Sequence, residues 1–125
     1  MAVVPHRSLR VKYGSALTAA IDAGVTIIPA MPGRVITIHD AWVRAAGAAD
    51  TATSVDISDG TTTVCVFTVA GLTDAAILRA GTTTTGVSTE LGTALKGSTG
   101  IQLATVGAGL GTTTAIEYCV KYSVT

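Results

Sequence analysis

Charged side chains are scarce in this chain. Asp, Glu, Lys and Arg make up only 13% of its 125 residues, whereas a soluble domain usually carries about 25%. Eight acidic and eight basic residues cancel, so the formal net charge is zero. Sparse charge and zero net charge favour association between protein molecules and leave no electrostatic footprint for nucleic acid. We therefore expect much of the surface to lie against other protein subunits rather than water.

Aromatic residues and long apolar runs are also rare. Aromatics account for 4% of the chain, too few to form a stacking surface for carbohydrate or single-stranded nucleic acid. Thr, Gly and Pro interrupt every apolar run before the roughly 18 residues that a membrane-spanning helix needs. Residues 1–10 place Pro5, His6 and Arg7 where a signal peptide would carry its apolar segment. These features predict cytoplasmic synthesis and no membrane partner.

Cysteine and histidine are too few for a metal centre of soft ligands. The chain has two cysteines, Cys65 and Cys119, and two histidines, His6 and His39. A zinc site needs about four such ligands close together, so we expect no metal and no cofactor. Cytoplasmic synthesis favours free thiols. The alternative is a disulfide between Cys65 and Cys119, which requires that the two cysteines lie on neighbouring strands.

β-branched residues and glycine dominate what is present, and the apolar pattern runs mostly at period two. The clearest case is the segment 114–125, where one face is apolar and the other is mixed. Alternation of this kind is typical of a half-buried strand. The apolar face carries Ile116, Tyr118, Val120, Tyr122 and Val124, and Cys119 falls on the more polar face.

An Asp-Gly pair between two β-branched runs predicts a hairpin. Asp59-Gly60 separates Val55–Ser58 from Thr61–Val69, and this dipeptide suits a two-residue turn with positive φ at both positions. The second arm has apolar residues on both faces near its end, so we interpret it as a central strand.

Further elements follow from the same pattern. Other strands are expected at Ser8–Tyr13, Val25–Ile28, Arg34–Ala46 and Ile101–Val106, and the last is expected to form a second hairpin with the C-terminal strand. Asp40 breaks the alternation of the long third strand, which a β-bulge or a buried hydrogen bond would explain. Short helices are expected at Ser15–Ala23 and Thr73–Ala80, each ended by a glycine. The segment 81–100 is interpreted as loop with a short strand around Glu90–Leu95.

Seven or eight short strands with few helices indicate an all-β fold. We predict a single-domain β-sandwich or jelly roll over residues 8–125, with one or two short helices. Residues 1–7 precede any pattern and are expected to form an extended N-terminal arm. Trp42 and Tyr118 are expected in the core.

No catalytic motif stands out. The run Gly107-Ala108-Gly109-Leu110-Gly111 lacks the spacing and the following helix of a dinucleotide-binding loop. His39 and Asp40 are neighbours on a strand, so their side chains should point to opposite faces. We therefore expect no enzyme activity. Oxygen atoms of Asp56, Ser58 and Asp59 could serve calcium, but turn formation accounts for Asp59.

The N-terminal region gathers basic residues. A solvated strand edge is one interpretation of this cluster, and an arm that docks on an acidic partner surface is the other. Pro5 disfavours helix and leaves the arm extended. The predicted partner-binding residues are Val3, Val4, Pro5, His6, Arg7 and Arg10.

Three segments together carry a resemblance. Ala23–Arg34, Ile36–Ala45 and Thr53–Asp59 resemble the jelly-roll head decoration or cement proteins of tailed bacteriophages. The resemblance covers about half of the chain and carries no catalytic signature. It implies a homotrimer on the outer capsid shell of the virion, assembled in the host cytoplasm and bridging major capsid protein subunits, with its N-terminal region on the shell. The alternatives are a phage tail or fibre component, and a small calcium- or carbohydrate-binding β-sandwich module.

Overall fold

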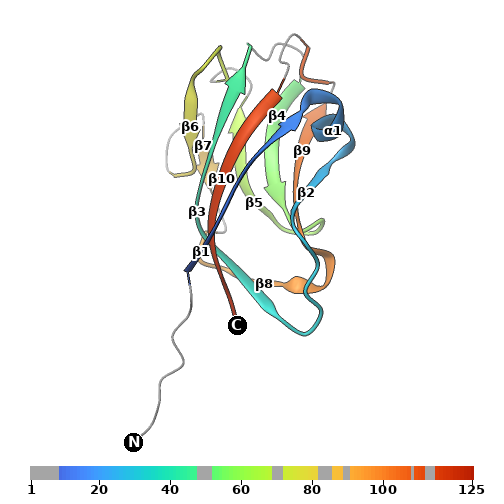
Figure 1. Cartoon of the computed structure of the whole chain (residues 1–125), viewed down its shortest axis with the longest axis vertical. Coiled ribbons are helices and arrows are strands. Elements are labelled where there is room, and N and C mark those ends of the chain that lie inside the picture. The colour runs from blue at the N-terminus through green and yellow to red at the C-terminus, as the bar shows by residue number, and fades with distance from the viewer. Residues whose placement is uncertain are drawn as a thin grey trace, which may run out of the picture.

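Two antiparallel β-sheets packed face to face form the fold (Figure 1). The computed structural model describes residues 9–47, 52–68, 72–81, 86–88, 91–107, 109–111 and 115–125. Sheet 1 has the order β1 (Leu9–Leu17), β10 (Ala115–Val124), β3 (Val35–Ala46) and β6 (Ile77–Arg79), and β8 (Ala94–Lys96) also pairs with β3. Sheet 2 has the order β2 (Val25–Ile28), β9 (Ile101–Gly107), β4 (Ala52–Ser58), β5 (Thr63–Thr68) and β7 (Gly86–Ser88). The predicted all-β sandwich is confirmed.

Strands pair in nested order along the chain. β1 pairs with β10, β2 with β9, β3 with β8, and β4 with β5. Among the strands that the structure describes, each consecutive pair lies in different sheets, except the pair β4 and β5 of the hairpin. The predicted second hairpin is therefore wrong, because β9 and β10 lie in different sheets.

The core lies between the sheets and follows the predicted alternation. On β10, Ile116, Tyr118, Val120 and Tyr122 are all buried. Sheet 2 contributes Val55, Ile57 and Phe67, which are fully buried. Each large apolar side chain removed from water in this way stabilises the fold by about 1.5–3 kcal/mol.

A β-bulge at His39 confirms the expected irregularity in β3. Lys121 pairs with Asp40, but the next β10 residue, Tyr122, pairs with Ile38. His39 is therefore the extra residue, and the buried side chains switch from Ile38 to Ala41. The bulge also removes the alternation across His39 and Asp40, so the expectation that they point to opposite faces is wrong.

Helix is scarcer than the local pattern predicts. One helix, α1 (Thr18–Ala23), ends at Gly24 as expected, but residues 15–17 continue β1 by pairing with β10. The expected helix at Thr73–Ala80 is wrong. Ala75 adopts a positive φ of 61° there, and β6 pairs with β3 instead. A 3-10 turn, η2 (Gly97–Thr99), lies within the segment 81–100 that was interpreted as loop.

The β4–β5 hairpin is confirmed, but its turn differs from the expected one. The only non-glycine residue with positive φ among those described is Ala75, so Asp59 does not adopt the positive φ of a two-residue turn. Asp59 Oδ1 instead accepts hydrogen bonds from the backbone N–H groups of Thr61 and Thr62. The carboxylate thus holds a longer loop closed.

β1 runs further than expected, to Leu17, and forms one edge of sheet 1 (Figure 1). It is held by nine residue pairs with β10. Gly14 permits this pairing, because a Cβ there would lie 2.5 Å from the hydroxyl oxygen of Tyr118.

Among the described residues, no helix is long and apolar enough to span a bilayer.

Candidate functional site

Arg10 is the predicted partner-binding residue that the structure places. It lies near the start of β1 and is exposed. The other predicted residues, Val3, Val4, Pro5, His6 and Arg7, and the arm at 1–7 as a whole, lie outside the described residues.

Strand β1 carries an exposed apolar strip. Leu9, Val11, Tyr13 and Leu17, which we call the β1 strip, are 68, 61, 60 and 71% exposed. They lie two residues apart on one face of the strand, with the exposed Ser15 between Tyr13 and Leu17. Single exposed apolar residues are ordinary, but a contiguous apolar patch on a soluble protein marks an interaction site. The β1 strip is therefore the first candidate for a binding surface.

The β1 strip continues across sheet 1 through an aromatic pair. Tyr13, Cys119 and Trp42 lie on three neighbouring strands in register. The Tyr13 and Trp42 rings have centroids 5.9 Å apart and planes tilted by 56°. Cys119, between them in the register, is only 8% exposed. The core position expected for Tyr118 is confirmed, but Trp42 is half-buried on the outer face of the sheet.

The carboxylates on this face are paired. Arg79 donates to Asp40 with an N–O distance of 2.6 Å, and Arg44 donates to Glu117 at 3.4 Å. The hydrogen bond from Arg79 lowers the pKa of Asp40 from its ordinary value. Beside the β1 strip, sheet 1 therefore offers little unpaired negative charge.

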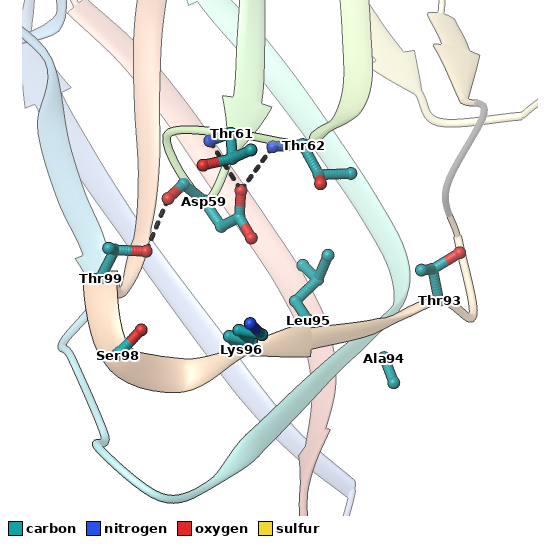
Figure 2. Close-up of a pocket in the computed structure, with 9 residues that line it drawn as sticks. All are labelled: Asp59, Thr61, Thr62, Thr93, Ala94, Leu95, Lys96, Ser98 and Thr99. Carbon is teal, nitrogen blue, oxygen red and sulfur yellow. Dashed lines mark hydrogen bonds between the residues drawn. The ribbon is translucent and has the colours of Figure 1, made fainter.

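A polar cavity of about 340 Å³ lies beside the β4–β5 loop (Figure 2). Its walls come from the loop itself, from β8 and from η2. Thr99 Oγ1 donates to the backbone carbonyl oxygen of Asp59 at 2.6 Å, which joins the loop to η2. The lining residues are Asp59, Thr61, Thr62, Thr93, Ala94, Leu95, Lys96, Ser98 and Thr99.

The residues considered for calcium have structural partners. Asp56 Oδ1 accepts a hydrogen bond of 2.7 Å from Ser54 Oγ, and burial raises the pKa of Asp56. Asp59 closes the hairpin loop. Within the described ranges, no three His, Cys, Asp or Glu residues gather as a metal site would require.

His39 has a partner that the sequence did not indicate. Its Nε2 lies 2.8 Å from Ser123 Oγ, on the neighbouring strand β10. Ser123 is 1% exposed, so its hydroxyl is not open to a substrate. Asp40, the adjacent acid, is bound to Arg79 instead. The pair therefore joins two strands and lacks the arrangement of a catalytic triad.

A search of family models, curated proteins and solved structures finds no match to this chain.

Both cysteines are free thiols in the structure, as expected. Cys65 lies on β5 in sheet 2 and Cys119 on β10 in sheet 1, and both are buried. Burial raises the pKa of Cys65 to about 12. A thiol of this kind is poorly suited to nucleophilic chemistry.

Proposed function

We propose that this chain is a structural virion protein, a capsid decoration or cement subunit without enzyme activity. It binds the major capsid protein on the outer shell as a homotrimer. The observation that carries the proposal is the β1 strip, an exposed apolar surface on an open sheet edge of a chain with little charge. A subunit that binds only the assembled shell stabilises that shell by mass action.

We further propose that the sandwich is of the jelly-roll type. Support comes from the nested pairing, in which the first strand pairs with the last and the second with the next to last. This order describes a long hairpin folded back over two sheets. Double-sheet jelly rolls are found in viral capsid proteins, so the topology suits the proposed setting without identifying it.

The β1 strip is suited to contact between copies. Net zero charge leaves no long-range repulsion between subunits. The strand is nine residues long, or about 30 Å, which is long enough to cross a subunit interface. In a cyclic trimer each copy would place this strip on a different surface of the next copy, so that no strip stays exposed.

The trimer is tested by changing the strip and measuring mass in solution. We expect light scattering to give the mass of three chains for the wild type and of one chain for Val11→Lys/Leu17→Lys. Two ammonium groups cannot be buried in an apolar contact without a partner. Val106→Lys is the matched control, because Val106 is exposed but lies on β9 in the other sheet. A wild type that stays monomeric at micromolar concentration contradicts self-association.

The location is tested on virus particles. Immunogold electron microscopy of particles from cells that carry the gene should label the outer shell.

Deletion of residues 1–7 should leave the fold intact, as measured by circular dichroism. It should reduce the gold label by at least about tenfold, because the arm adds contacts to each of several linked subunits. Label on the tail favours a tail or fibre component, and unlabelled particles contradict a virion role.

A carbohydrate-binding module is the second candidate, favoured by the Tyr13–Trp42 pair on the outer face of sheet 1. The tilt of 56° between the rings does not give one flat platform. A rise in melting temperature with a glycan, lost in Trp42→Ala, would favour this function over the structural one.

A further inference from the structure

A groove of about 400 Å³ lies at the end of sheet 1 where the chain enters β1 and leaves β10. Figure 1 shows this end of the sheet near the label for the C-terminus. Three separate parts of the chain form the groove: the start of β1, the loop between β2 and β3, and the end of β10. Its lining residues are Arg10, Met31, Pro32, Arg34 and Val124.

The two arginines of this groove have no carboxylate partner in the part of the chain that the structure describes. Arg44 and Arg79 are paired with Glu117 and Asp40, but neither Arg10 nor Arg34 forms such a pair. Both are exposed. The groove therefore holds two guanidinium groups that remain available to an anion.

The rest of the lining restricts the kind of anion. Met31 and Val124 are half-buried, and they pack against the core. With Pro32 they add a small apolar wall to a groove whose exposed lining is otherwise formed by its two cations. An acidic peptide whose carboxylates alternate with apolar side chains complements both features, because guanidinium groups form paired hydrogen bonds with carboxylates.

The chain's own N-terminal segment is a poor occupant. Residues 1–8 contain no acidic residue and carry His6 and Arg7, so like charges would meet in the groove. A second copy would have to supply an extended segment with closely spaced carboxylates. Only Asp56 and Asp59 lie within five residues of each other in this chain, and both already accept hydrogen bonds within their own subunit. A bare polyanion such as nucleic acid would leave the apolar wall exposed.

We infer that the groove formed by Arg10, Arg34, Met31, Pro32 and Val124 binds an acidic, partly apolar segment of a partner protein. That the partner is the capsid subunit rests on the proposed function. The groove lies directly after the arm for which the sequence predicted an acidic partner. It adds Arg34, which only the fold brings into the same groove as Arg10.

The groove is tested with untagged protein and a short fluorescein-labelled peptide of alternating glutamate and leucine. Fluorescence anisotropy should show binding that weakens about fivefold in Arg10→Ala and again in Arg34→Ala, as for exposed ion pairs of about 1 kcal/mol. Lys12→Ala is the matched control, since Lys12 lies on the same strand and face as Arg10 but does not line the groove. Its affinity should equal that of the wild type.

Control peptides and NMR locate the site. The glutamine–leucine and lysine–leucine peptides should not bind, and chemical shifts should change at the groove residues rather than at the polar cavity. The proposal is overturned by equal binding of the glutamine peptide, by unchanged affinity in the double arginine variant, or by shift changes elsewhere. Tighter binding of a short oligonucleotide than of the acidic peptide would also overturn it.

Failure of the groove and failure of the proposed function are distinguishable. If wild-type protein labels the shell and Arg10→Ala/Arg34→Ala labels it equally, the capsid role stands and the groove is not its docking site. If wild-type protein forms no trimer and labels no particle, the proposed function fails, while peptide binding still reports on the groove.

Discussion

Gly100→Ala is expected to lower the free energy of unfolding by about 4 kcal/mol, or the melting temperature by about 15 °C. Gly100 has φ 72° and ψ −177°, a conformation that is almost restricted to glycine. A Cβ there would lie 2.6 Å from the carbonyl oxygen of Ile28 and 3.0 Å from the backbone nitrogen of Ala30. These are backbone atoms, and Ile28 pairs with Ile101 with both side chains fully buried. These backbone atoms therefore cannot shift to accommodate a Cβ without disturbing the paired strands and the core.

Gly60→Ala separates the cost of the backbone conformation from the cost of the steric clash. Gly60 has φ 93°, but a Cβ there would meet no atom within 4 Å. Its replacement should cost about 1 kcal/mol from backbone conformation alone. Urea unfolding followed by circular dichroism gives both values. Equal losses for the two variants would show that the contact between the start of β9 and the end of β2 is not close-packed.

Local alternation predicted the strands well because each strand has one face in the core. β2 was predicted with its observed bounds, and β3 and β10 within about one residue at each end. The irregularity near His39 was also visible in the sequence, where Asp40 breaks the alternation. The sequence left a bulge and a buried hydrogen bond as explanations, and the register shows the bulge.

Pairing between strands was not predictable in the same way. A period of two shows which face of a strand is apolar, but it does not show which strand lies beside it. The glycine-rich stretch 107–111 fits a hairpin turn locally, yet β9 and β10 join different sheets. At residues 73–80 helix propensity was overridden when β6 paired with β3, a tertiary interaction.

For the candidate binding surfaces as well, the local pattern was predictable and the tertiary arrangement was not. The alternation of Leu9, Val11 and Tyr13 was visible, but only the position of β1 at a sheet edge leaves these side chains exposed. Arg10 was predicted from the basic cluster. Arg34 was not, because it reaches the groove through the loop that precedes β3.

Cys65 is expected to react with a thiol reagent about a thousandfold more slowly than an exposed cysteine at about pH 8. Burial, which contributes most, and the negative charges of Asp40 and Asp56 raise its pKa to about 12. The thiolate is the reactive form, so a higher pKa leaves little of it at this pH. Cys119→Ser leaves Cys65 as the sole thiol. The rate at which an aromatic disulfide reagent releases its coloured thiolate then measures the reaction of Cys65 alone.

The same pKa makes stability fall at alkaline pH. In the unfolded chain the thiol loses its proton near pH 9, whereas the folded protein keeps it until about pH 12. The folded state thus binds more protons in this interval, and the free energy of unfolding decreases as the pH rises through it. Cys65→Ala should flatten that decrease. Rapid labelling of Cys65 in the Cys119→Ser variant, under conditions where circular dichroism shows a folded protein, would mean that sheet 2 opens locally at β5.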